Sequence, residues 1–467
     1  MEAQKAEKAE QARKSMIDKV LERTMAVSRE EARALGWAFS YFFALLCSYY
    51  IIRPMRDEMG IAGGVAHLQW LFSGTFLAML AVVPLFGWIT RRYTTRRFLP
   101  FVYYFFIGSL LVFYALFKSD VTQAFVARAF FIWVSVFNLF VVSVFWSFMA
   151  DTFTNQQAKR LFGVIAAGGT AGALCGPALT AALVVHIGPA NLLPLAAAIL
   201  AWAVLCIHRL IAWKRTTSAR HLRSDGENAS ALSGAETEHR SEKAMGGSIF
   251  AGVKLVFRSS YLAGICLLIL LYSSLATFLY FQQAQIVKES FDDAATRTAV
   301  FAVMDFSVNA ITLAVQIFIT GRLIRKVGMG WTLALIPVLL VIGFLALATA
   351  PVLGVIVVVQ VLRRAGNYAI MRPAREMLYV VLGREEKYKA KNFIDTVVYR
   401  GGDAVSAWFY AALQSLGLSA SQIALMAAPL AAIWSWISFR LGKRQERMAA
   451  VTSSEKRPSA TEGGHYE

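Results

Sequence analysis

The chain is poor in charged residues for its length. Aspartate, glutamate, lysine and arginine make up 16% of its 467 residues, whereas a typical soluble domain has about 25%. Its mean hydropathy is +0.53, and apolar stretches of about 20 residues, long enough to cross the hydrocarbon core, recur along the chain. This composition excludes an ordinary soluble globular protein and predicts an all-α, polytopic membrane protein.

Acidic residues and cysteines are also scarce. The chain has 29 acidic and 47 basic residues, a net charge of +18. The basic residues cluster in short loops, as the positive-inside rule describes, so we expect a lipid bilayer and no nucleic acid as partner. The four cysteines lie in apolar stretches without metal-site spacing, and no hydrolase or P-loop motif occurs. The sequence therefore predicts a transporter, not an enzyme, with no cofactor or metal.

The apolar stretches predict twelve membrane-spanning helices in two groups of six. They fall at 35–58, 67–89, 98–117, 123–150, 161–186, 190–212, 260–286, 298–320, 331–350, 352–382, 392–415 and 420–440. A polar stretch rich in serine, glycine and charge separates the groups and is typical of a disordered linker. The predicted parts are a cytoplasmic N-terminal segment (1–33), a six-helix bundle (34–213), a cytoplasmic linker (214–248), a second six-helix bundle (249–441) and a cytoplasmic tail (442–467).

The loops predict the orientation in the membrane. Basic residues follow the second, fourth, sixth, eighth and tenth predicted spans, and the alternate loops are neutral or mildly acidic. Both termini are therefore predicted to be cytoplasmic. The two halves also repeat each other, because the stretch 87–93 after the second span resembles 321–328 after the eighth. Transporters built from such duplications bind their substrate between the halves, near the bilayer midplane.

Eight of the arginines inside the predicted spans indicate a function. A guanidinium keeps its charge at any relevant pH, and each one at mid-depth costs roughly 2.5–3.5 kcal/mol. Its forked donors match phosphate and carboxylate oxygens in pairs. The pattern predicts a transporter for a phosphorylated or otherwise anionic solute. These arginines are Arg53, Arg56, Arg128, Arg363, Arg364, Arg372, Arg375 and Arg400.

Helical periodicity places most of these charges on one side of the first and the tenth predicted spans. Arginines suit phosphate oxygens and tyrosines suit a base or sugar, although other aromatic or phosphorylated anions would fit as well. The predicted substrate-binding residues are Tyr49, Arg53, Arg56, Asn138, Arg363, Arg364, Asn367, Tyr368 and Arg375.

Nearby carboxylates offer an alternative role for the same arginines, because buried charges are normally paired. Asp305 is either a proton or cation coupling site or the partner of Arg400 or another base. Arg128 lies near the outer surface, where an interfacial role is expected. The residues predicted to form gates or ion pairs are Asp57, Glu58, Asp151, Lys159, Arg372, Glu376, Lys391, Asp395, Arg400 and Asp403.

Two sets of motifs resemble known families. The basic turns after the second and eighth spans and the 6 + 6 layout resemble the major facilitator superfamily, although Arg91 and Arg325 replace the acidic residue of its loop signature. The segments RPMRDEM from Arg53, FWSFMADTF from Phe145 and RPAREML from Arg372 resemble the ATP:ADP antiporter family, in its free-living bacterial branch.

The resemblance implies exchange of ATP and ADP by alternating access across a bacterial inner membrane. An alternative on the same fold is a proton-coupled carrier of another organic anion or amphiphile, with Asp305 or Glu376 titrating.

Overall fold

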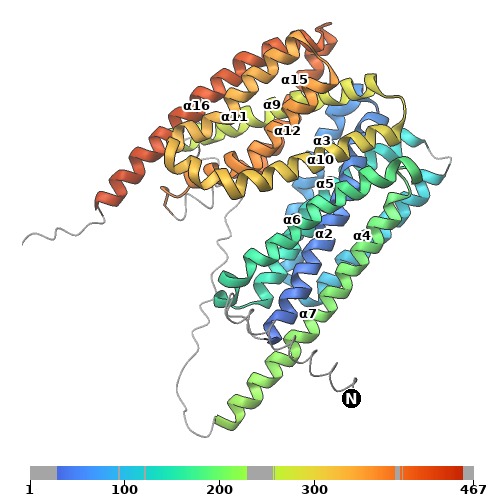
Figure 1. Ribbon diagram of the computed structural model, residues 1–467, viewed down its shortest axis with the longest axis vertical. Coiled ribbons are helices and arrows are strands. Elements are labelled where there is room, and N and C mark those ends of the chain that lie inside the picture. Colours follow the sequence, from blue (N-terminus) through green and yellow to red (C-terminus); the bar gives the residue numbers. More distant parts are fainter. Residues whose placement is uncertain are drawn as a thin grey trace, which may run out of the picture. The chain divides into compact units, whose positions relative to one another are not determined.

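The computed structural model describes residues 29–92, 95–119, 122–228, 258–383 and 393–455, together with positions 256, 390 and 391. This part of the chain contains helices and no strand (Figure 1), which confirms the all-α prediction for it. Most of the predicted N-terminal segment, the linker beyond residue 228, the loop at 384–389 and the end of the tail lie outside the described residues.

The first half of the described chain has six long helices and one short 3₁₀ turn. They are α2 (Arg29–Ala62), η1 (Val65–His67), α3 (Leu68–Arg92), α4 (Thr95–Lys118), α5 (Gln123–Thr152), α6 (Asn155–Ile187) and α7 (Leu192–Asn228). α7 corrects the prediction that a disordered linker begins at residue 214. The stretch after Trp213 contains lysine, arginine, alanine and leucine and no proline, and these residues favour continuation of a helix.

The second half contains α-helices interrupted by three π-helical turns. They are α9 (Ser260–Ser290), α10 (Ala294–Val315), η2 (Gln316–Thr320), α11 (Gly321–Thr349), α12 (Leu353–Gly366), η3 (Asn367–Met371), α13 (Arg372–Leu378), η4 (Ile394–Val398), α15 (Tyr399–Ser415) and α16 (Ala420–Glu455). The helix α16 continues beyond residue 441, where the sequence predicts the start of a tail.

Ten helical stretches among the described residues are long and apolar enough to cross a membrane. One of them, Ala294–Thr349, has 56 residues and contains Gly328 in the left-handed region at φ 80°. The carboxylate of Glu446 on α16 accepts the backbone N–H of Met329 at 2.6 Å, which holds this bend. α15 is not among the ten stretches.

Contacts divide the chain into two compact units. The first comprises residues 1–53, 84–119 and 137–240, and the second comprises 54–83, 120–136 and 241–467. The predicted halves, 34–213 and 249–441, differ from these units, because the segments 54–83 and 120–136 belong to the second unit. In that unit, Ile61, Leu68 and Phe131 join the hydrophobic core of the C-terminal helices.

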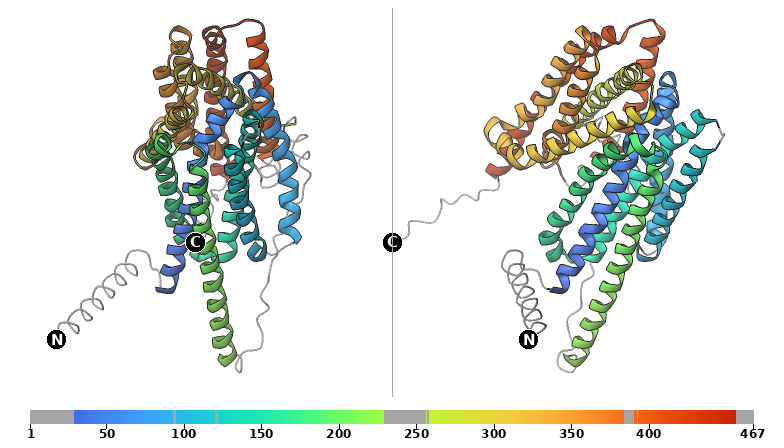
Figure 2. Two further views of the ribbon diagram at one scale, coloured as in Figure 1. Left: turned by 90° about the vertical axis from the view of Figure 1, so that its right-hand side faces the viewer. Right: turned by 45° about the vertical axis from the view of Figure 1, so that its right-hand side comes forward.

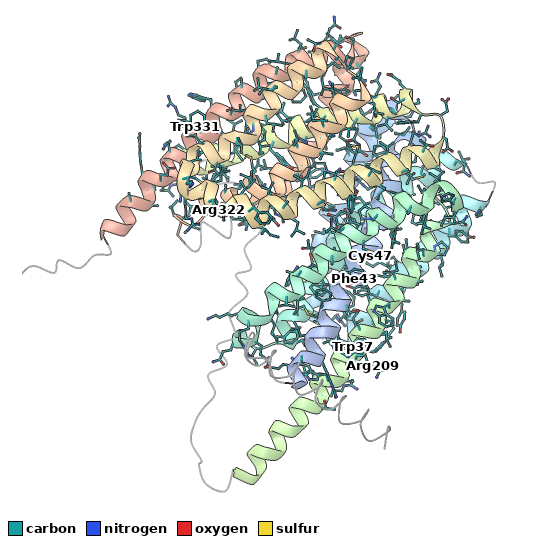
Figure 3. All side chains as sticks on the ribbon, viewed as in Figure 1. Trp37, Phe43, Cys47, Arg209, Arg322 and Trp331 are labelled. Atoms are coloured by element: carbon teal, nitrogen blue, oxygen red, sulfur yellow. The ribbon has the colours of Figure 1, made fainter. Side chains whose placement is uncertain are left out.

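The first unit is built on close packing between α2 and α6. A Cβ atom added at Gly172 would lie 2.3 Å from the carbonyl oxygen of Phe43, and one at Gly176 would lie 2.6 Å from that of Cys47. Small residues let helices approach this closely. Figure 3 shows Phe43 and Cys47 on α2. These positions explain the run of glycines in α6.

The second unit is built around the contact between α11 and α16. α11 and α16 run alongside each other in Figures 1 and 2. Trp434 of α16 is fully buried, and its ring centroid lies 5.9 Å from that of Tyr272 on α9. α9, α11 and α16 form this core. α12 packs against α9 and α11, and α15 packs against α9.

Candidate anion-binding site

A π-helical turn interrupts the arginine-bearing helix of the second unit. The turn η3 follows α12 directly and begins at Asn367. The side chain of Gln316 donates to the carbonyl oxygen of Tyr368 at 3.3 Å, and the Thr320 hydroxyl donates to that of Ala369 at 2.8 Å. Both donors lie in another π-helical turn, η2. Such turns often occur at functional sites, and these bonds hold η3 in one conformation.

Arg363 is a buried cation that forms no ion pair with a carboxylate of the described residues. Its side chain is 7% exposed. Nε and Nη2 donate to Oε1 of Gln360 at 3.1 and 2.8 Å, and Arg363 makes no ion pair with any residue that the structure describes. A buried charge without a counterion is costly. The guanidinium is therefore suited to an anionic ligand.

The next residue, Arg364, is neutralised by the protein itself. Its Nη2 forms an ion pair with Oδ1 of Asp305 on α10, and Asp305 is fully buried. Of the two partners predicted for Asp305, the structure thus favours another base over Arg400. Because this pair is internally compensated, α12 carries one excess positive charge, on Arg363.

The part of α2 in the second unit carries two sets of charge contacts. Nη1 of Arg56 lies 3.2 Å from Oδ1 of Asp57, which also accepts the hydroxyl of Tyr280 at 3.1 Å. Next to them, both oxygens of Glu58 accept from Arg297 on α10, each at 2.8 Å. Bidentate pairs of this kind are the strongest charge-assisted contacts, so α2 is firmly tied to α10.

Arg56 is also oriented by contacts with α5. Its Nε donates to the hydroxyl of Ser135 at 3.2 Å, and its guanidinium lies 4.0 Å from the ring centroid of Phe131. Arg128, another α5 residue, donates from Nε to the carbonyl oxygen of Gly63 at 2.9 Å. Arg128 therefore joins α5 to the turn that follows α2.

α15 contributes a further arginine and carboxylate. Nη1 of Arg400 lies 3.6 Å from Oδ2 of Asp403, one turn later on the same helix. The hydroxyl of Thr277 on α9 lies 3.5 Å from the other oxygen of Asp403. This pairing agrees with the predicted ion-pair role of both residues and is looser than the Glu58–Arg297 pair.

Two ion pairs lie at the end of α13. Nζ of Lys391 is 2.5 Å from Oε2 of Glu376, and Nη2 of Arg375 is 3.8 Å from Oδ1 of Asp395. Arg372 is exposed. Arg375 was predicted to bind substrate, and the structure places it in an ion pair. Its buried Nε makes no hydrogen bond within the described residues.

The first unit holds the remaining predicted site residues. The guanidinium of Arg53 lies 5.5 Å from the ring centroid of Tyr50, and the ring of Tyr49 lies 5.1 Å from the same ring. Asn138 on α5 is half-buried. The predicted gate residues of this unit are Asp151 and Lys159, which are exposed; neither forms an ion pair in the described part of the chain.

The sequence does not predict several of these partners. Gln360 lies three residues before Arg363, and this spacing alone could have identified it. Arg297 lies just outside the predicted span 298–320, and the sequence does not indicate its pairing with Glu58. Glu31 was assigned to the N-terminal segment. It accepts from Gln157 at 2.7 Å, which joins the starts of α2 and α6.

Comparison with known proteins defines the class of this molecule. The family model of the Major Facilitator Superfamily matches residues 34–381, which is most of the chain. The protein therefore belongs to the major facilitator superfamily and is a multi-pass membrane transporter. This family assignment confirms one part of the resemblance found in the sequence, and it agrees with the all-helical architecture.

The particular relatives are nucleotide carriers. A model described as TLC ATP/ADP transporter matches residues 337–442, from the middle of α11 into α16. ADP,ATP carrier protein 1 of Chlamydia muridarum is 22% identical over 90% of this chain and 92% of its own length. ADP,ATP carrier protein 2 of Chlamydia pneumoniae is 22% identical over 88% of each chain. The predicted resemblance to ATP:ADP antiporters is confirmed.

Solved structures support the fold. The nucleoside transporter NupG superposes with a TM-score of 0.59 at 12% sequence identity, covering 89% of this chain and 99% of that one. An auto-inhibited POT family peptide transporter gives 0.57 at 13% identity, over 93% and 99% of the two chains. At this identity the likeness concerns the fold alone.

Proposed function

We propose that this transporter exchanges an anionic, phosphorylated solute, with ATP and ADP as the favoured pair, by alternating access. The observation that carries the proposal is Arg363, a buried guanidinium without a carboxylate partner in the described residues. The similarity to ADP,ATP carriers names the class of solute. Phosphate oxygens would supply the acceptors and negative charge that Arg363 lacks.

The remaining predicted binding residues form the rest of the proposed site. Arg53, Arg56 and Tyr49 on α2, Asn138 on α5, and Asn367, Tyr368 and Arg375 after α12 would contact the solute in different steps of the cycle. Arg364 would contact it only after release from Asp305, which makes the Arg364–Asp305 pair a competitor of the solute.

Exchange follows from the same charge argument. An empty carrier has an uncompensated cation on α12, and this excess charge opposes reorientation in a medium of low dielectric constant. A bound anion compensates the charge. We infer that the loaded protein reorients far faster than the empty one, so transport in one direction requires a solute on the other side.

Two groups of ion pairs at opposite ends of the helices support alternating access. The Glu58–Arg297 and Arg56–Asp57 pairs lie near the α2–α3 turn. The Lys391–Glu376 and Arg375–Asp395 pairs lie at the end of α13. In the proposed cycle, each group would break while the other remains closed.

The proposed topology is twelve spans with both termini cytoplasmic in a bacterial inner membrane. Dividing Ala294–Thr349 at Gly328 and adding η4 with α15 raises the ten candidate stretches to this number. The basic loops support this orientation. Labelling single-cysteine variants in cells with an impermeant thiol reagent tests it, and labelling of Ser119→Cys but not Thr154→Cys is expected.

The test of function is exchange in liposomes. Purified protein in vesicles loaded with ATP should take up labelled ADP, and empty vesicles should take up far less. Arg363→Gln should reduce uptake by about ten- to a hundredfold, because a hydrogen bond to a charged group contributes about 1.5–3 kcal/mol. Arg322→Gln, which changes an exposed arginine of the same type, is the matched control.

A structural role for Arg363 predicts a different result. If Arg363→Gln lowered the melting temperature strongly and left exchange by the folded fraction intact, the binding role would be wrong. Equal uptake by loaded and empty vesicles would contradict exchange.

A second candidate is proton-coupled transport of another organic anion or amphiphile. The supporting observation is Asp305, a fully buried carboxylate within the membrane-spanning region. A pH gradient would then drive uptake without internal solute, and Asp305→Asn would abolish the pH dependence. Asp305→Asn with Arg364→Gln is the appropriate control, because it removes the whole pair.

A further inference from the structure

One face of α16 changes from apolar to basic along the helix. Leu425, Ile433 and Trp436 are exposed on this face, and 57% of Trp436 is accessible. Arg440 and Arg444 continue the same face at helical spacing and are exposed as well. In a membrane protein, tryptophan is enriched where the acyl chains meet the lipid headgroups. The two arginines, which follow Trp436 along the helix, therefore lie where headgroups are expected.

Both arginines are oriented by aromatic rings. The guanidinium of Arg440 lies 4.6 Å from the ring centroid of Trp436. That of Arg444 lies 5.5 Å from the ring centroid of Tyr261 near the start of α9, and its Nη1 donates to the hydroxyl of Ser260 at 3.1 Å. Arg444 thus joins α16 to α9, two helices that pack together. These five residues form the α9–α16 seam.

The α9–α16 seam carries positive charge that the described part of the chain does not neutralise. Neither of its two arginines forms an ion pair with a residue that the structure describes. Glu446, close by on α16, is bonded instead to Lys443 at 2.9 Å and to the backbone N–H of Met329 at 2.6 Å. Arg258, two residues before Ser260, adds a third exposed positive charge. The seam is therefore suited to a negatively charged partner.

The first unit repeats this combination between α2 and α7. The guanidinium of Arg209 on α7 lies 5.9 Å from the ring centroid of Trp37 on α2 (Figure 3). The ring centroid of Trp37 is 6.4 Å from that of the exposed Trp202, whose Nε1 donates to the hydroxyl of Ser40 at 2.9 Å. Arg209 is exposed and makes no ion pair within the described residues. These four residues form the α2–α7 seam, which joins the first and last helices of its half as α9 and α16 do in theirs.

The chemistry of both seams favours a lipid headgroup over a soluble anion. Guanidinium groups bind phosphate oxygens in pairs, and basic pockets between membrane helices bind anionic headgroups. A soluble phosphate would contact the arginines alone, whereas the acyl chains of a phospholipid would also cover the exposed side chains of Ile433 and Trp436. A zwitterionic lipid carries a cation that the arginines repel, so a headgroup of net negative charge is favoured.

We propose that each seam binds the phosphate of one anionic phospholipid. Arg440 and Arg444 hold the phosphate in the α9–α16 seam, and Arg209 holds it in the α2–α7 seam. In the proposed topology both seams lie on the cytoplasmic side, so the lipid comes from the inner leaflet. This inference lies beyond the proposed function, because it requires neither a nucleotide nor exchange.

The first test compares lipids on the purified full-length protein in detergent. Melting temperature is measured with phosphatidylglycerol, which is anionic, and with phosphatidylcholine, which has the same phosphate and no net charge. Phosphatidylglycerol should raise the melting temperature saturably, and phosphatidylcholine should raise it much less. Equal shifts with the two lipids, or no shift with either, would overturn the proposal. This comparison needs no variant and does not depend on transport.

The second test locates the lipids by native mass spectrometry. The unmodified protein should retain two phosphatidylglycerol molecules. One should be lost in Arg440→Gln with Arg444→Gln, one in Arg209→Gln, and both in the triple variant. Because these arginines are exposed, the melting temperature without lipid should not change. The matched control is Arg322→Gln with Arg325→Gln, two exposed arginines of α11 that donate to carbonyl oxygens of their own helix, and it should retain both lipids.

Two further outcomes would contradict the assignment. Retention of both lipids in the triple variant, or equal loss in the α11 control, would show that the seams do not select the lipid. Inorganic phosphate distinguishes a headgroup from a free ion. If it raised the melting temperature of the unmodified protein and this shift disappeared in the triple variant, the arginines would bind a soluble anion and the proposal would be wrong. Failure of nucleotide exchange would leave all of these results unchanged.

Discussion

α6 and α12 both contain residues that are unusual in a membrane-spanning helix, but they solve different problems. α6 of the first unit carries glycines that lie against the backbone of α2, with less than 3 Å available to a Cβ atom at Gly172. α12 of the second unit carries two adjacent buried arginines. The glycines have no side chain and so let α2 and α6 approach closely. The arginines place positive charge in the protein interior, where it must be compensated.

The two helices differ in what stabilises their unusual residues. The α2–α6 contact is satisfied within the protein and requires no ligand. On α12, Asp305 compensates Arg364, and the hydrogen bonds of Arg363 within the described residues go to the neutral Gln360. Packing therefore completes the first contact, while the second is where we propose that an anion binds. Substitutions in the first and the second unit should therefore change the stability of the protein to different extents.

The largest effect on stability is expected for Glu58→Gln in the second unit. The substitution removes the bidentate partner of Arg297 and leaves that guanidinium, whose side chain is 13% exposed, without its carboxylate. Breaking a buried pair costs about 3–5 kcal/mol. Chemical denaturation in detergent measures the loss in unfolding free energy. Glu289→Gln, an exposed carboxylate near the same end, is the control, and a similar loss in both variants would refute the claim.

Gly172→Ala in the first unit should have a smaller effect. The new methyl group would meet the carbonyl oxygen of Phe43 at 2.3 Å and the backbone nitrogen of Cys47 at 2.9 Å. Overpacking costs about 1–3 kcal/mol. Gly163→Ala changes the same helix at a position with nothing within 4 Å and should not destabilise. If both variants melt alike, close packing does not hold α2 to α6.

Thr320→Val should destabilise the π turn after α12 to a smaller extent. The Thr320 hydroxyl donates to the carbonyl oxygen of Ala369 at 2.8 Å, and hydrogen bonds between membrane helices contribute about 0.6 kcal/mol on average and up to 1.7. Hydrogen exchange of the η3 amides should increase. In Thr349→Val no such increase is expected, and an equal increase in both would show that η3 does not depend on Thr320.

The smallest effect is expected at Asp293, which precedes α10. The backbone N–H of Thr296 at 2.7 Å and its hydroxyl at 2.9 Å donate to Oδ2, and these bonds lower the pKa of Asp293 below its ordinary value. The stabilisation is therefore present above the ordinary pKa and is lost as the pH falls through the lowered one. Asp293→Asn keeps a capping side chain and should remove this part of the acid dependence of the melting temperature. An unchanged acid profile would exclude the contribution.

The sequence predicted the site better by residue type than by partner. The helical period and the cost of charge in a bilayer placed Arg363, Arg364 and Asn367 in the interior, and all three are buried. The sequence does not decide whether Asp305 pairs with Arg400 or with another base. Arg364 and Arg400 lie 59 and 95 positions from Asp305, and both separations are too long for a local pattern to indicate contact. The contacts of Glu58 with Arg297 likewise join residues 239 positions apart.

Helix ends were harder to predict than helix centres. α7 passes residue 214 because local propensity permits it, and polarity alone does not end a helix outside the bilayer. The π turns were not foreseen either. They depend on donors such as Gln316, whose position opposite Tyr368 is set by the packing of η2 against η3.

The amino-acid sequence alone is enough to identify a helical membrane transporter with arginines inside its spans, because bilayer thickness and the cost of burying guanidinium groups constrain any chain of this composition. It does not say which arginine keeps an uncompensated charge. That depends on distances of a few ångströms between distant segments, since electrostatic attraction and hydrogen bonding act only between groups that folding has brought together. In the fold, Arg364 is paired with Asp305, whereas Arg363 is bonded to the neutral Gln360.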